Sequence, residues 1–147
     1  MSEQLKQGLY LYCLADSNYL TEVKGAGIDD KNDLFLKHKN GIALVLSQVA
    51  LDDFVGSEAE ERLQDINWIG PKALCHQDIV TQIMASSPIL PARFGTIFST
   101  EDEMDILLDL HTQTIKEFLE KIHDHQEWSI KGYLDKKNYS KSRQKQN

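Results

Sequence analysis

The sequence predicts a single α+β domain in which amphipathic helices cover one face of a mostly antiparallel sheet. Residues 8–14, GLYLYCL, alternate as a strand that is buried on both faces. The segment 34–49 places the dipeptide Asn40-Gly41 between two apolar alternations, which is typical of a two-residue hairpin turn. Residues 104–122 carry apolar side chains at helical spacing, which predicts a long amphipathic helix.

Each remaining element has its own local signal. We expect a long connection over 15–32 and hairpin strands at 34–38 and 42–49. Ser57 with Glu60 forms a capping box, which predicts a helix start. The dipeptide Gly70-Pro71 is expected to interrupt this helix, and a second helix then ends near Ala85.

The second half of the chain predicts two more strands around the long helix. The segment SPILPARF, 87–94, predicts a short strand that lies at an edge of the sheet or meets a bulge, because Pro91 lacks a backbone donor. Thr100 and Glu103 form the capping box of the long helix. The segment EWSIKGYL, 127–134, alternates like a strand with one face inward. This order of elements favours a variant of the ferredoxin-like topology.

Composition limits the classes of function. A chain of 147 residues with 41% apolar content suits one main domain, predicted to span 1–135. Residues 136–147 carry five basic side chains and no acid, and we expect this tail to be disordered. The net charge of −7 argues against nucleic-acid binding. Apolar runs are too short to cross a membrane and the start does not resemble a signal peptide, so we expect a cytoplasmic protein. Cys13 and Cys75 are predicted to be reduced core side chains.

No common catalytic signature, phosphate loop or metal-ligand spacing occurs, so we predict no catalytic residue, cofactor or metal. His76 falls on the apolar stripe of its helix, where a histidine needs a hydrogen-bond partner. Arg93 and Glu127 each lie beside an aromatic residue, and we hypothesise that Arg93 pairs with Glu127 or with carbonyl groups of its loop. Gly95 is expected to supply a positive φ angle or a close backbone approach.

Three motifs in order resemble the gas vesicle accessory protein family GvpL/GvpF. They are the opening YLY (10–12), the segment PARFGTIF (91–98) and the segment EWSIK (127–131). The resemblance covers about residues 8–134 and implies the amino-terminal α+β domain of that family. It implies a non-enzymatic role in building gas vesicles, by binding the shell protein GvpA or other accessory proteins during nucleation or growth, or as a minor shell component. The family-motif or interaction candidates are His76, on the helix before the second motif, and Arg93, Phe94, Gly95, Glu127 and Trp128 within the motifs.

Two other interpretations stay open. The domain could bind a small molecule or catalyse a reaction with His76 and Arg93, which would require both side chains to converge in a pocket. It could also associate with itself, because strand edges that lack a partner favour dimers.

Overall fold

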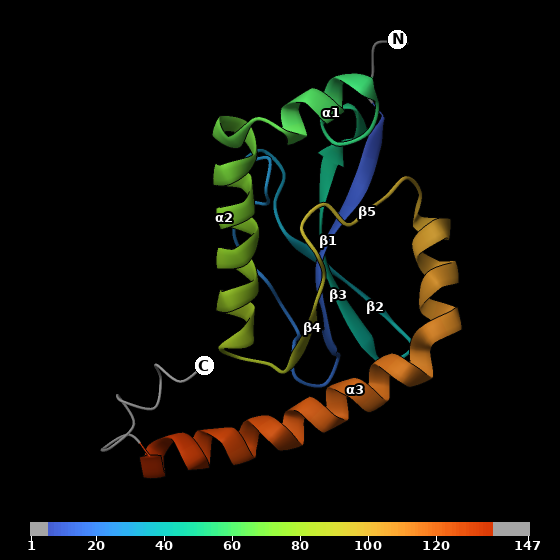
Figure 1. Cartoon of the computed structure of the whole chain (residues 1–147). Coiled ribbons are helices and arrows are strands. Elements are labelled where there is room, and N and C mark those ends of the chain that lie inside the picture. The colour runs from blue at the N-terminus through green and yellow to red at the C-terminus, as the bar shows by residue number, and fades with distance from the viewer. Residues whose placement is uncertain (1–5, 137–147) are drawn as a thin grey trace.

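The computed structural model describes residues 6–136, and the side chains of residues 57, 58 and 124–136 lie outside the description. Figure 1 shows a central sheet between helices. The elements in chain order are β1 (Gln7–Asp16), β2 (Phe35–Lys39), β3 (Ile42–Ala50), the 3-10 helix η1 (Leu51–Asp53), α1 (Ser57–Leu63), α2 (Ile66–Met84), β4 (Ile89–Pro91), β5 (Ile97–Phe98) and α3 (Glu101–Lys136).

The sheet has the strand order β2-β3-β1-β4, and β5 pairs with a separate stretch of β1. Every pairing between these strands is antiparallel. This order and these directions match a ferredoxin-like sheet, and the helices α1 and α2 form its second crossover. The first crossover, residues 17–34, holds no helix and only an isolated bridge between Ala26 and Asp33. The predicted α+β class and antiparallel sheet are therefore confirmed.

The prediction that helices cover one face of the sheet is wrong, because α1 and α2 lie on one face and α3 lies on the other (Figure 1). The physical reason is that the central strands are apolar on both faces. Tyr10 and Val45 belong to the core beside α2, while Leu11 and Leu44 belong to the core beside α3. Each face therefore needs its own cover.

A bulge in β1 sets which side chains reach each core. The register of β1 against β3 shifts between Leu11 and Cys13. As a result Tyr12 and Cys13, although adjacent, both enter the core beside α2, whereas Leu14 packs on the side of α3. Both cysteines are free thiols, Cys13 buried and Cys75 half-buried, as expected.

The hairpin and the edge strand form where the sequence predicts them. Asn40 has a φ of 57° and Gly41 a φ of 80°, which are the positive angles that this tight turn needs. The strand that contains Pro91 lies at the edge of the sheet, paired only with β1 among the described residues. There the missing proline N–H removes no ladder bond.

The break between the two helices does not fall at Gly70-Pro71, as the sequence predicted. Helix α2 passes through Pro71, which lies in its second turn and removes a single helical bond. Gly70, the residue before Pro71, has no Cβ to clash with the proline ring, so the helix can accommodate this proline. The break falls after Gln64, because the Asp65 side chain accepts a hydrogen bond from the Asn67 N–H and caps α2.

The two predicted capping boxes have different outcomes. Helix α1 starts at Ser57 as expected, but Gly56 is the N-cap residue and Ser57 is already helical. At the start of α3, the Glu103 N–H donates to the Thr100 hydroxyl over 3.1 Å. The Glu103 carboxylate accepts from the Ser99 N–H over 2.9 Å, so this second box is confirmed with its return bond one residue earlier.

Helix α3 is longer than predicted, and the strand expected at 127–134 is wrong. The backbone of that segment continues α3 to Lys136. No glycine or proline separates Ile122 from Glu127, so nothing in the sequence ends the helix there. The tail predicted to be disordered lies outside the described residues from 137 onward. Among the described helices, none has a stretch both long and apolar enough to cross a membrane.

Candidate protein-binding surfaces

The loop between β4 and β5, residues 92–96, is tied to buried side chains of two other elements. His76 of α2 is only 5% exposed, and its Nε2 lies 3.0 Å from the carbonyl oxygen of Ala92. The Tyr10 hydroxyl of β1 lies 2.7 Å from His76 Nδ1 and accepts the Gly95 N–H over 3.0 Å. Because a carbonyl only accepts, Nε2 carries the proton, and Tyr10 donates to Nδ1.

Burial sets the protonation of this cluster. It lowers the pKa of His76, while the bond to the Ala92 carbonyl acts weakly in the opposite direction. Burial also raises the pKa of Tyr10 far above its usual range. Both side chains are therefore neutral near pH 7 and serve as hydrogen-bonding groups. The expectation that His76 is a satisfied structural histidine is confirmed.

Tyr12, the second tyrosine of the opening motif, anchors the connection between β1 and β2. The Tyr12 hydroxyl lies 2.7 Å from the Ser47 hydroxyl of β3 and accepts the Ile28 N–H over 2.8 Å. Burial raises the pKa of Tyr12 to about 12. The alternating tyrosines of β1 thus hold one loop each, a role that periodicity alone does not reveal.

Phe94 fills the space under the loop. Its ring packs edge-on against Tyr10, His76 and Phe54, with centroid distances of 6.3, 5.9 and 6.4 Å. Trp68 of α2 extends this aromatic cluster outward, 5.7 Å from Phe54. Aromatic pairs at these distances add to the burial energy. Phe94 therefore holds the loop in place.

The other motif residues of the loop face outward. Arg93 is exposed, and its guanidinium has no hydrogen-bond or ion-pair partner among the described residues, so the expected bonds to carbonyl groups of its loop are wrong. Gly95 has a φ of 85°, as the sequence predicted, with no atom within 4 Å of the place a Cβ would take. The side chains of Glu127 and Trp128 lie outside the description, so the Arg93–Glu127 pair stays a prediction. Glu127 and Trp128 lie on α3 and not on a strand beside β4. The reason for expecting Glu127 close to Arg93 is therefore removed.

A groove runs between α3 and the β4 side of the sheet. It has a volume of about 250 Å³ and an almost wholly apolar lining of side chains from β1, β3, β4, β5 and α3. Leu107 lines it and is 45% exposed, and on the adjoining surface of α3 Leu110 is 73% and Ile106 61% exposed. Large apolar side chains gathered in this way are typical of a protein-binding surface.

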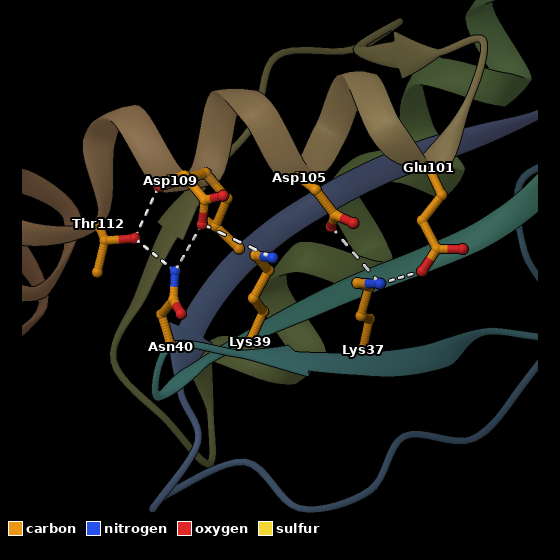
Figure 2. Close-up of polar contacts among 8 residues, drawn as sticks. Lys37, Lys39, Asn40, Glu101, Asp105, Asp109 and Thr112 are labelled. Carbon is orange, nitrogen blue, oxygen red and sulfur yellow. Dashed lines mark hydrogen bonds and ion pairs between the residues drawn. The ribbon is translucent and has the colours of Figure 1, made fainter.

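The opposite side of α3 is held by polar contacts from the hairpin (Figure 2). Lys37 pairs with Glu101 and with Asp105, the latter over 3.5 Å, and Lys39 lies 3.7 Å from Asp109. In addition the Asn40 amide donates to Asp109 over 3.0 Å and to Thr112 over 2.9 Å. This ladder of contacts was not predicted from the sequence. Its signal is three acids four residues apart on the helix and two lysines two apart on the strand.

The predicted site residues do not form a catalytic pocket. His76 is enclosed beneath the loop, whereas Arg93 is outside it, so the convergence that a reaction would need does not occur. Within the described residues, no group of His, Cys, Asp and Glu side chains is placed to hold a metal ion. The geometry instead offers a loop anchored by hydrogen bonds and an apolar groove in an α+β domain.

The chain matches the family model "Gas vesicle synthesis protein GvpL/GvpF" over residues 8–147. It therefore belongs to the GvpL/GvpF family of gas vesicle accessory proteins. It is 25% identical over 109 residues to gas vesicle protein L of Streptomyces sp. (strain CB03234), covering 74% of this chain and 41% of that protein.

Two crystal structures share the fold. Gas vesicle protein GvpF from Anabaena sp. PCC7120 has a TM-score of 0.60 and 19% identity, over 95% of this chain and 57% of that one. GvpF from Microcystis aeruginosa has a TM-score of 0.54 and 22% identity, over 78% of this chain and 43% of that one. This chain thus spans about half the length of the relatives it matches.

Proposed function

We propose that this chain is a non-enzymatic gas vesicle assembly factor that binds the shell protein GvpA during nucleation or growth. Membership of the family supplies the process, and the apolar groove along α3 is the observation that supports binding. A shell subunit exposes apolar surface before it assembles, and a soluble partner with an apolar groove can cover that surface. Other accessory gas vesicle proteins are the alternative partners, and a place in the finished shell is a further possibility of the same role.

Strand addition is a weaker route to a partner. Three of the described strands are outer ones: β4 is three residues long and contains Pro91, β5 is only two residues long, and β2 carries Lys37 and Lys39. Proline and lysine at an edge both discourage pairing with another strand. Both faces of the sheet are covered by helices, so an open face is not available either. The groove is therefore the favoured surface, and self-association through an edge stays a prediction that sedimentation at several concentrations would test.

The test is co-expression of the tagged chain with GvpA, and separately with each other accessory protein, followed by pull-down. Leu110→Glu places a charge on the exposed stripe beside the groove, and we expect it to reduce GvpA recovery by about tenfold, as at an interface hot spot. Leu74→Glu is the matched control, because Leu74 is 68% exposed on α2, away from the groove. Circular dichroism would verify that both variants fold.

The outcomes separate the alternatives. Recovery of GvpA that Leu110→Glu loses and Leu74→Glu keeps would support the proposal. Recovery of an accessory protein alone would change the partner but keep the role in assembly. A folded wild-type chain that retains no gas vesicle protein would overturn the proposal.

A further inference from the structure

The loop at residues 92–96 is more firmly anchored than a connection between two short strands requires. Its ends are fixed to β1, by the Ala92 N–H on the Tyr12 carbonyl over 3.0 Å and by the Leu11 N–H on the Thr96 carbonyl over 2.9 Å. The carbonyl of Arg93 accepts from both the N–H and the hydroxyl of Thr96, over 3.2 and 2.8 Å. Loops that hold functional groups in a fixed place are built in this way.

None of these contacts uses the guanidinium group of Arg93. They fix the backbone of Arg93 on both sides, and the bonds from His76 and Tyr10 hold the neighbouring residues from beneath. The Arg93 side chain is exposed and unpaired among the described residues. Arg93 is also the only charged residue between Ser86 and Thr100. The fold thus presents one cation from an anchored loop in a chain whose net charge is −7.

The surface around this cation is open. At Gly95 no atom lies within 4 Å of the Cβ position, so a partner backbone can approach closely. A guanidinium group binds a carboxylate through two parallel hydrogen bonds.

We infer that Arg93 is a contact residue for an acidic segment of another gas vesicle protein. A carboxylate of that segment binds the guanidinium group of Arg93. The inference rests on the proposed function and adds a second, charged contact to the apolar groove. The loop anchors of Tyr10 and His76 are positioning residues for this contact. They place the guanidinium before the partner arrives, which reduces the entropy that binding costs.

The experiment uses the full chain and the gas vesicle protein that the wild-type chain retains in co-expression. Arg93→Gln is expected to weaken binding by about tenfold and to flatten its dependence on salt, while Arg93→Lys keeps part of both. Lys24→Gln, on the exposed connection between β1 and β2, removes the same charge elsewhere and should bind like the wild type. Because Arg93 is exposed, all three variants should unfold at the wild-type temperature.

Each result decides a different claim. Unchanged affinity of Arg93→Gln, with the wild type still retaining its partner, overturns this inference and leaves the proposed function standing. An equal loss in Lys24→Gln also overturns it, because the effect would then follow net charge alone. A wild-type chain that retains no gas vesicle protein overturns both.

Discussion

Replacing Tyr10 by Phe isolates the contribution of one hydroxyl group to the anchored loop. The ring stays, so its packing against Phe54, His76 and Phe94 is retained. What disappears is the donor to His76 Nδ1 and the acceptor of the Gly95 N–H. The substitution therefore tests whether these hydrogen bonds, and not only the aromatic burial, hold residues 92–96.

The magnitude follows from the two groups left behind. His76 is buried, so its Nδ1 would lose its partner without access to water, at a cost of about 1–3 kcal/mol. The Gly95 N–H, which donates to the Tyr10 hydroxyl in a partly buried bond, also loses its acceptor and adds to this cost. For a chain of this size, such a loss of stability lowers the melting temperature by roughly 3–10 °C.

The assay is urea unfolding followed by circular dichroism, with Tyr19→Phe as the matched control. Tyr19 is 48% exposed and its hydroxyl reaches His123 over 3.3 Å, so its loss should change the free energy of unfolding by less than about 0.5 kcal/mol. Combining Tyr10→Phe with His76→Leu should cost less than the sum of the two single changes, because both partners are then gone. A Tyr10→Phe protein as stable as Tyr19→Phe would refute the reasoning.

Two further predictions concern the same loop. The pKa of His76 is lowered in the folded chain, so the unfolded chain binds a proton at this residue more readily than the folded chain does. The free energy of unfolding should therefore fall as the pH drops below about 6.5, by at most about 1.4 kcal/mol per pH unit. Urea unfolding from pH 7 to 5 measures this fall, and an equal fall in His76→Leu would contradict it. Gly95→Asn should cost less than Gly95→Val, because the φ of 85° disfavours a β-branched residue most and no atom crowds the site; equal melting temperatures for the two variants would show that backbone conformation at Gly95 is unimportant.

Local signals predicted the parts of the fold that depend on local physics. Alternation located β1 and the hairpin, the Asn40-Gly41 dipeptide gave its turn, and helical spacing with the Thr100 cap gave the start of α3. The burial of His76 followed from its place on an apolar stripe. In each case the deciding interaction lies within a few residues or within one element.

The failures occurred where tertiary contacts or weak stop signals decide. The segment 127–134 alternates well enough for a strand, yet a helix that meets no breaker continues through it. The Gly70-Pro71 dipeptide predicts a helix boundary, although a proline in the second turn of a helix costs only one hydrogen bond. Which face a helix covers cannot be derived from its own stripe, because Met104 and Ile79 show similar local patterns and lie in opposite cores.

The motif residues show why a recurring pattern in a sequence does not itself assign a role. In PARFG the aromatic ring of Phe94 enters the core while the neighbouring guanidinium of Arg93 faces water. The groups that fix this division, Tyr10 and His76, lie 85 and 16 residues away from the loop positions that they bind. A change at Tyr10 or His76 should therefore alter both stability and partner binding, whereas a change at Arg93 should alter binding alone. Measuring both quantities for each variant separates the residues that contact the partner from those that position them.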